Sequence, residues 1–290
     1  MVLVLSLLLI LISVAFFTLL ERKVLGFIIL RVGPNKPSFR GILVPFADAI
    51  KLLTKPYIFP HSSSHQLMYF ACLLLFLIPA LLWSLLRFPS AGLDCPLRIL
   101  FVLVLMSFPI FGILGRGWGS NRKYAILGAT RSVAQSISYE VCLSLTFLIF
   151  ALFKGLDFLA PSSFYMLLFS FHSCVLLFVI CLAESNRSPF DFAEGESELV
   201  SGFNVEFSGS LFVVLFLSEY LSILFLRFLI ASLIRDGVWL TNILLCGLIA
   251  FSFLWTRGTL PRYRYDTLML LCWQSLLPFL LCCFGLFLVL

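Results

Sequence analysis

Long apolar runs separated by short polar stretches dominate this chain. They fall at residues 2–30, 67–87, 97–115, 125–153, 163–184, 208–231, 237–256 and 267–290. Most of these runs have the roughly 20 residues that an α-helix needs to cross the hydrocarbon core of a bilayer. The pattern predicts an all-α polytopic membrane protein with about eight transmembrane helices, organised as a single transmembrane domain over residues 1–290.

The composition agrees with this pattern and narrows the class of protein. Hydrophobic residues make up 61% of the 290 residues, charged residues make up 12%, and the mean hydropathy is +1.10. A water-soluble domain usually has about 25% charged residues. Eight crossings also leave no room for a sizeable soluble domain, so chemistry that needs one must come from partner chains.

The basic residues are unevenly divided between the two sides of the predicted membrane protein. Eight crossings put both termini on one side and the loops after the first, third, fifth and seventh helices on the other. That second side receives fifteen of the 20 Lys and Arg residues: Arg22, Lys23, Arg31, Lys36, Arg40, Lys51, Lys55, Arg116, Arg122, Lys123, Arg131, Arg187, Arg257, Arg262 and Arg264. The side of the termini receives Arg87, Arg98, Lys154, Arg227 and Arg235. Because basic loops favour the inner face of a membrane, the termini are predicted outside and the motif-rich loops inside.

Two inner-face loops carry most of the polar motifs. The first, residues 31–66, opens with a Gly-Pro-Asn turn signal and then has apolar residues at helical spacing from Ile42 to Leu53. This stretch is too short to span and predicts a helix along the membrane surface, although an ordinary amphipathic connector would have the same pattern. The second, residues 185–207, holds five of the 14 acids: Asp191, Glu194, Glu196, Glu198 and Glu206.

The acidic loop also contains a helix-start signal. Ser188, Pro189 and Asp191 match an N-cap, a first-turn proline and a capping box, so a short helix is predicted to begin there. Asp191, Glu194 and Glu198 would then share one face. A solvated acidic surface is an equally good explanation of these carboxylates.

Three further acids lie in or at the ends of predicted transmembrane helices: Glu140, Glu184 and Glu219. An acidic side chain at the centre of a bilayer costs roughly 2.5 to 3.5 kcal/mol, so such acids usually face protein or water. A carboxyl group removed from water can also exchange a proton near neutral pH. Each acid could instead be structural, satisfied by an arginine or by hydroxyl groups, but three of them near one acidic loop favour a hydrated polar path.

Polar residues form a broad stripe just before Glu140. Arg131, Gln135 and Ser138 recur at helical spacing, and Ser132, Ser136 and Glu140 occupy the adjacent face. Hydrogen bonding between helices would explain the hydroxyl groups alone. The added Arg and Glu favour a water-lined interior.

Other kinds of site receive little support from the sequence. The nine cysteines have no CxxC or Cys/His ligand spacing, which argues against a zinc site, an iron–sulfur cluster or a disulfide framework. His61 and His65 are four residues apart but have no nearby third ligand. The chain has no Walker-type or GxGxxG loop, and its basic inner-face loops account for the net charge of +6 without nucleic acid.

Five segments together resemble a known family. They read ERKVLGFIILRVGPN, PFADAIKLLTK, GSNRKYAILGATRSVAQSISYE, AESNRSPFDFAEGESELVSGFNVEFS and LWTRGTLPRYRYDTLM. In this order they are similar to the NADH dehydrogenase subunit 1 family, the quinone-site membrane subunits of respiratory complex I, over essentially the whole chain. The short termini and loops favour the mitochondrial branch.

The resemblance implies a core subunit of proton-pumping NADH:ubiquinone oxidoreductase, a translocase of the mitochondrial inner membrane. Its helices would frame the tunnel of a long-tailed quinone and couple quinone reduction to proton translocation. NADH, FMN and the iron–sulfur clusters would be held by partner subunits of the hydrophilic arm, so no metal, flavin or redox centre is expected in this chain. The implied partners are the other complex I subunits, lipid and quinone.

Matching the motifs residue by residue assigns two groups of residues. The resemblance implies a quinone path lined by Glu21, Arg22, Phe46, Asp48 and Arg131. It implies a proton path through Glu140, Glu184, Asp191, Glu194, Glu196, Glu198, Glu206 and Glu219. The chain departs from the family after the predicted surface helix, where Lys55 is followed by Pro56 instead of an acid.

Other functions stay open at the level of the sequence. The membrane subunit of an energy-converting hydrogenase shares several of these motifs without using quinone. A secondary transporter should show an internal repeat with paired broken helices, which the sequence lacks. A passive membrane anchor would not need acids within apolar helices.

Overall fold

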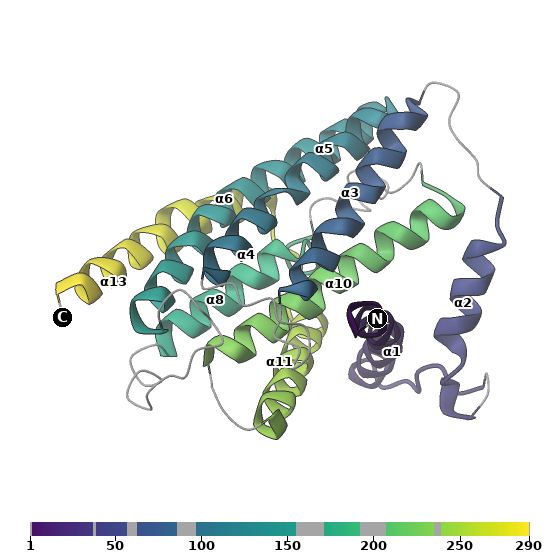
Figure 1. Cartoon of the computed structure of the whole chain (residues 1–290), viewed down its shortest axis with the longest axis horizontal. Coiled ribbons are helices and arrows are strands. Elements are labelled where there is room, and N and C mark those ends of the chain that lie inside the picture. The colour runs from purple at the N-terminus through teal and green to yellow at the C-terminus, as the bar shows by residue number, and fades with distance from the viewer. Residues whose placement is uncertain are drawn as a thin grey trace.

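The computed structural model describes residues 2–36, 39–56, 63–85, 97–154, 171–191, 207–234 and 239–289. Within these ranges the chain forms helices joined by turns, and it has no strand (Figure 1). The helices are α1 (Val2–Ile28), η1 (Phe39–Gly41), α2 (Val44–Leu53), α3 (His65–Ser84), α4 (Arg98–Ser107), α5 (Pro109–Ser120), α6 (Lys123–Lys154), α8 (Phe171–Glu184), α10 (Gly209–Ile234), α11 (Trp239–Thr259), α12 (Tyr265–Leu270), the π-helical stretch η3 (Leu271–Leu276) and α13 (Leu277–Val289). The predicted all-α architecture is confirmed.

Seven helical segments of the described residues are long and apolar enough to cross a membrane. They coincide with seven of the eight predicted runs. The remaining run, residues 163–184, is represented by α8, and its first part lies outside the described residues. The run predicted at 97–115 is longer than expected, because α4 and α5 together form one crossing from Arg98 to Ser120. Pro109 opens the second half, and its missing N–H accounts for the interruption at Phe108.

Glycines allow α5 to pack closely between α3 and α6. A Cβ atom at Gly117 would lie 2.4 Å from the Cβ of Ala129 on α6, and one at Gly112 would lie 2.4 Å from the Cγ of Leu75 on α3. Membrane helices gain little from the hydrophobic effect between them and depend on such close contact of small residues. These two glycines therefore hold together the helices that form one wall of the site described below.

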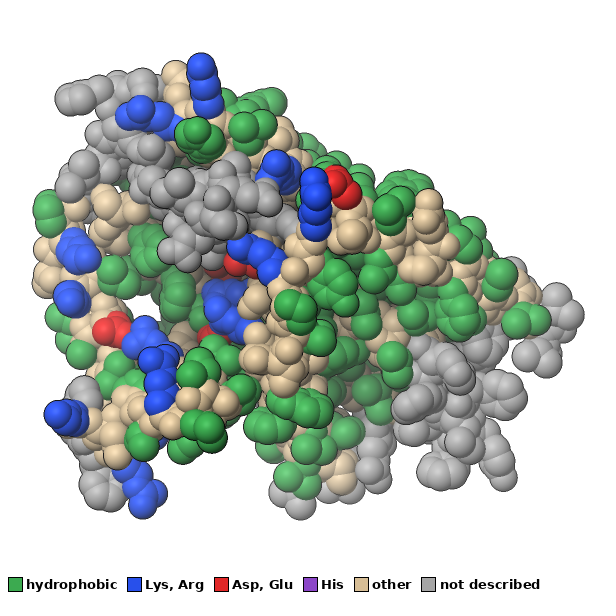
Figure 2. All heavy atoms as spheres, turned by 180° about the vertical axis from the view of Figure 1, so that it is seen from behind, with side chains coloured by type: hydrophobic (Ala, Val, Ile, Leu, Met, Phe, Trp, Pro, Cys, Tyr) green, Lys and Arg blue, Asp and Glu red, His purple; other side chains and the backbone are tan. Residues whose placement is uncertain are grey.

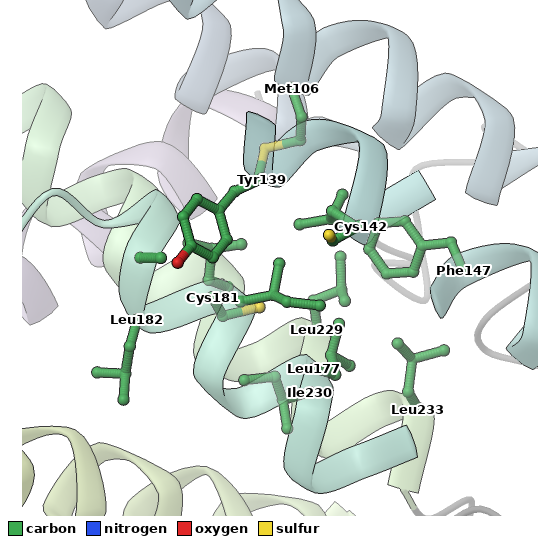
Figure 3. Packing of buried hydrophobic residues seen from close by; sticks show 14 of the residues in the cluster. Met106, Tyr139, Cys142, Phe147, Leu177, Cys181, Leu182, Leu229, Ile230 and Leu233 are labelled. Atoms are coloured by element: carbon green, nitrogen blue, oxygen red, sulfur yellow. The ribbon is translucent and has the colours of Figure 1, made fainter. Parts of the chain in front are cut away.

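The largest apolar cluster contains buried residues of α4, α6, α8 and α10, joined by residues of α3, α11, α12, η3 and α13. Met106, Tyr139, Phe147 and Leu177 belong to this cluster, and their side chains gather there from α4, α6 and α8 (Figure 3). Large apolar side chains also remain exposed on the outer faces of the helices. Helices that are hydrophobic on all faces suit a bundle that packs internally and faces lipid outside.

The helix α2 stands apart from the main bundle (Figure 1). None of its residues is buried within the chain, and its main contacts are with α1 and α10. A helix is thus present within the predicted stretch from Ile42 to Leu53, and its position along the membrane surface stays a prediction. After α2 the backbone at Lys55 passes the start of α10 so closely that a Cβ atom at Gly209 would lie 3.1 Å from the Lys55 carbonyl oxygen.

The helix predicted to begin at Ser188 is wrong for the described residues. Ser188, Pro189 and Phe190 form turns and a bend, and the Phe190 N–H closes a turn onto the Arg187 carbonyl at 2.8 Å. The Tyr263 N–H donates to the Pro189 carbonyl at 3.1 Å, and the Arg262 Nε donates to the Asp191 carbonyl at 2.6 Å. These carbonyl groups are directed at another segment of the chain, which outweighs the local capping signal.

Candidate functional site

A buried carboxylate lies at the centre of the candidate site. Helix α1 directs Glu21 into the bundle, where it is only 6% exposed. Arg257 of α11 forms an ion pair with Glu21 Oε1, and the hydroxyl group of Tyr220 on α10 donates to Glu21 Oε2 at 2.5 Å. A buried charge is tolerated only when it is paired and hydrogen-bonded, and Glu21 meets both conditions.

Arg187, in the segment after α8, connects Glu21 to a second carboxylate. Its Nη1 donates to the Tyr220 hydroxyl at 2.9 Å and lies 3.7 Å from Glu21 Oε1, while its Nη2 lies 3.6 Å from Glu219 Oε2. The guanidinium carbon is also 4.3 Å from the centre of the Tyr220 ring. On the far side of Glu219, Arg116 of α5 approaches Glu219 Oε1 to 3.5 Å. We call Glu21, Arg116, Arg187, Glu219, Tyr220 and Arg257 the ion network.

Two cavities adjoin the ion network. The larger, of about 90 Å³, has Arg116, Ser136, Glu184 and Glu219 among its polar lining residues and continues between apolar side chains of α3, α4 and α10. The smaller, of about 20 Å³, lies beside Glu21. Both are lined by Ser185 and Arg187, so Arg187 stands where the two cavities meet. One water molecule needs roughly 10 to 15 Å³ of such space, so the larger cavity has room for several and the smaller for one.

Glu184 is the acid least matched by protein groups. Its Oε2 atom is buried and has no hydrogen-bond partner among the described residues, although its side chain lines the larger cavity. Ser136, which lies one turn before Glu140 on α6, lines the same cavity. Water in the cavity would satisfy the Glu184 carboxyl group and link it to Glu219.

The predicted polar stripe on α6 faces the interior. Ser132, Gln135, Ser136 and Ser138 are all buried. The Gln135 amide donates to the carbonyl groups of Ala183 at 2.9 Å and Phe190 at 3.1 Å, which anchors both ends of the segment that carries Glu184 and Arg187. Part of the stripe therefore positions the ion network through hydrogen bonds between elements.

Neighbouring residues of α1 point in different directions. Glu21 is buried, whereas Arg22 faces outward and donates to Asp48 of α2 at 2.6 Å. Both partners of that pair are about half exposed, at 50% for Arg22 and 42% for Asp48. Phe46 of α2 lies edge-on to Phe16 of α1, with ring centres 6.0 Å apart. The structure thus brings Arg22, Phe46 and Asp48 together at the α1–α2 contact and separates Glu21 from them.

The other sequence candidates lie elsewhere. Arg131 is near the start of α6, a helix that packs mainly against α5, α8 and α13. Asp191 pairs with Arg262 at 3.2 Å, beside the start of α12. Glu194, Glu196, Glu198 and Glu206 lie outside the described residues, as does His61. In the part of the chain that is described, no three His, Cys, Asp or Glu side chains are grouped to hold a metal ion.

Sequence reasoning missed the cations and the hydroxyl group that connect the acids. The sequence pattern gave no role to Arg116, Arg187 and Arg257 beyond that of positive charges on the inner face. It gave no role to Tyr220. A signal was present for Tyr220, since it directly follows Glu219. Arg227, which the count of basic residues assigned to the side of the termini, lies within α10 and is only 4% exposed. Lys and Arg side chains do gather on one side of the molecule, around a hollow with acidic side chains in it (Figure 2).

Comparison with known proteins gives a consistent result. A family model described as NADH dehydrogenase matches residues 1–288. The chain is 46% identical over 277 residues to the NADH-ubiquinone oxidoreductase chain 1 of Aedes aegypti, covering 93% of this chain and 88% of that one. It is 46% identical over 282 residues to the protein of the same name from Artemia franciscana, covering 94% and 93%. The protein of that name from Carassius auratus is 44% identical over 283 residues, covering 93% and 87%.

Proposed function

The chain belongs to the NADH dehydrogenase family, and we propose that it acts as a core membrane subunit of NADH:ubiquinone oxidoreductase, respiratory complex I. In this role it frames the access path of the quinone and couples quinone reduction to proton translocation. The observation that best supports this proposal is the ion network at the junction of two cavities, where Arg187 lies 3.7 Å from Glu21 and 3.6 Å from Glu219.

The network suits proton transfer because each acid has a neighbour that can take or supply a proton or a hydrogen bond. Glu184 and Glu219 both line the larger cavity, as does Ser136, which lies one turn before Glu140 on α6. We propose that protons move between these acids through cavity water. Glu21 joins the path through Arg187 and Tyr220, which hold its carboxylate in place.

The described cavities fit water better than a quinone headgroup. Pockets for small molecules typically measure roughly 300 to 1,000 Å³, whereas the larger cavity measures about 90 Å³. We therefore place the headgroup against partner subunits, where NADH, FMN and iron–sulfur clusters supply the electrons. Protons delivered along the acids would complete reduction of the quinone to the quinol.

The quinone tail is proposed to pass the α1–α2 contact. Phe16 and Phe46 offer apolar surface there, and Arg22 and Asp48 mark its polar rim. Each square ångström of apolar surface kept from water stabilises a bound tail by roughly 25 cal/mol. Arg131 would act at a separate position, since α6 lies away from this contact.

Asp191, Glu194, Glu196, Glu198 and Glu206 are proposed to extend the proton path along the acidic loop. The proposed location is the mitochondrial inner membrane, with both termini on the intermembrane-space side and the motif-rich loops in the matrix. The proposed partners are the other membrane-arm and hydrophilic-arm subunits of the complex, together with lipid and quinone. A passive anchor would have no use for a buried network of carboxylates and arginines.

Replacing Glu219 with Gln in the assembled complex tests the proton role. The change keeps the shape of the side chain but removes its charge and its capacity to exchange a proton. NADH:quinone reductase activity and proton pumping should both fall, while electron transfer from NADH to a hydrophilic artificial acceptor stays at the wild-type rate. The matched control is Asp266→Asn, since Asp266 is an exposed carboxylate paired with Arg264 at 3.2 Å outside the network.

Two outcomes would contradict the proposal. If Glu219→Gln pumps protons at the wild-type ratio and rate, Glu219 is not on the path. If a photoreactive long-tailed quinone labels partner subunits but never α1 or α2, the proposed tail path is wrong. Loss of all activities, including that with the artificial acceptor, would show an assembly defect, and Glu219→Asp would then replace the first variant.

A further inference from the structure

Arg227 is a buried cation that the ion network does not use. It lies on α10 and is 4% exposed, seven residues beyond Tyr220, or roughly 10 Å further along the helix axis. Its guanidinium carbon is 3.9 Å from the centre of the Phe17 ring on α1 and 5.0 Å from that of Phe253 on α11. Its Nε and Nη1 atoms are buried without a hydrogen-bond partner among the described residues.

The aromatic rings satisfy only part of what this guanidinium needs. A cation over an aromatic ring is stabilised, but removing an unpaired charge from water costs more than that contact returns. Aromatic rings also provide no conventional acceptor for Nε and Nη1, which lack a hydrogen-bond partner among the described residues. An acceptor carrying negative charge would satisfy both the hydrogen bonds and the charge.

The small cavity beside Arg227 carries an excess of positive charge. Its lining includes three arginines, Arg187, Arg227 and Arg257, and one acid, Glu21. Both oxygens of that acid are already occupied, since Arg257 pairs with Oε1 and Tyr220 donates to Oε2. Arg227 therefore lies at a cavity whose single carboxylate has been taken by other groups.

The size of the cavity limits what can occupy it. The small volume, about 20 Å³, favours a single monatomic ion over a carboxylate ligand, a phosphate or a lipid headgroup. The lining also has an apolar part, formed by Phe17, Ile223, Phe253 and Leu254. A halide suits this mixture, because it carries negative charge, accepts hydrogen bonds from any direction and can lie against apolar side chains.

We infer that this cavity is a binding site for a single halide ion, with Arg227 as its principal ligand and Arg187 and Arg257 as supporting cations. The halide would supply the acceptor for Nε and Nη1 of Arg227 and balance the excess charge next to Glu21. It would also tie α1, α10 and α11 together at the depth of Phe17 and Phe253. Neither the proton path nor the quinone path is needed for this inference.

Anomalous diffraction from crystals of the whole complex grown in bromide tests the site directly. Bromide replaces chloride and scatters anomalously, so a peak is expected in the cavity within hydrogen-bonding distance of Arg227. With Arg227→Gln, half-occupancy should need at least about tenfold more bromide, since a hydrogen bond to a charged group is lost. The matched control is Arg264→Gln, which removes an exposed arginine paired with Asp266 and should leave the peak unchanged.

A second variant guards against a folding defect. Arg227→Lys keeps the positive charge and should retain a bromide peak, even if Arg227→Gln fails to assemble. Absence of a peak in the wild-type complex at saturating bromide would overturn the inference. So would a peak of equal height in Arg227→Gln and wild type, which would mark an adventitious ion only.

Discussion

Removing the hydroxyl group of Tyr220 is the smallest change to the ion network that should measurably lower turnover. It donates to Glu21 at 2.5 Å and accepts from Arg187 at 2.9 Å. Tyr220→Phe deletes one oxygen and leaves the ring in place, including its contact with the Arg187 guanidinium at 4.3 Å. The perturbation is therefore confined to two hydrogen bonds, both to charged groups.

The expected magnitude follows from those two bonds. A hydrogen bond to a charged group contributes about 1.5 to 3 kcal/mol, which corresponds to a change in rate of roughly 10- to 150-fold. Arg187 keeps its ion pairs at 3.7 Å with Glu21 and 3.6 Å with Glu219, and Glu21 keeps Arg257. Because these contacts hold the remaining groups, we expect the lower end of the range, about tenfold.

The assay is NADH:quinone reductase turnover of the assembled complex, with proton pumping measured in sealed vesicles. Transfer from NADH to a hydrophilic acceptor reports that the hydrophilic arm is intact. The matched control is Tyr139→Phe, since the Tyr139 hydroxyl is also buried but lies 3.4 Å from the Leu268 carbonyl, outside the network. Wild-type turnover and pumping in Tyr220→Phe would refute the reasoning. Equal losses of turnover in both variants would show that the effect of Tyr220→Phe comes from general destabilisation.

Three further changes have expected outcomes. Glu184→Gln should lower coupled quinone reduction while leaving NADH oxidation by an artificial acceptor intact, because Glu184 faces the larger cavity and its Oε2 has no partner among the described residues; unchanged pumping would remove it from the path. Arg22→Ala should alter the KM for quinone or inhibitor sensitivity but cost less than about 1 kcal/mol of stability, since its pair with Asp48 is exposed; identical kinetic curves would count against a quinone role. Leu177→Ala, at a fully buried position of the apolar cluster, should destabilise the subunit by about 2 to 5 kcal/mol and reduce the amount of assembled complex on native gels; a normal yield would show that partner subunits mask the cavity.

The candidate site could be read from the sequence only in part. Glu184 and Glu219 were found because a carboxylate in or at the end of an apolar run is conspicuous, and both lie at the larger cavity. Glu21, which lies at the smaller cavity, was assigned only by the family resemblance, and to the quinone path. The arginines that connect these acids were not found, because Arg187 and Arg257 look like ordinary loop or helix-end cations. Their role depends on contacts across the bundle, such as the ion pair between Arg257 and Glu21.

The sequence by itself determined the helices, because in lipid every backbone hydrogen bond must be made within the segment and the apolar run alone decides where a helix lies. It also determined the short helix α2. Only the tertiary structure decided that Glu21 turns inward while Arg22 turns outward, and that Arg227 lies against Phe17 and Phe253. It also decided that the described residues from Ser188 to Phe190 form turns and a bend instead of the start of a helix. These outcomes depend on residues that are far apart in the sequence but close in the structure. A local sequence pattern does not reveal such contacts.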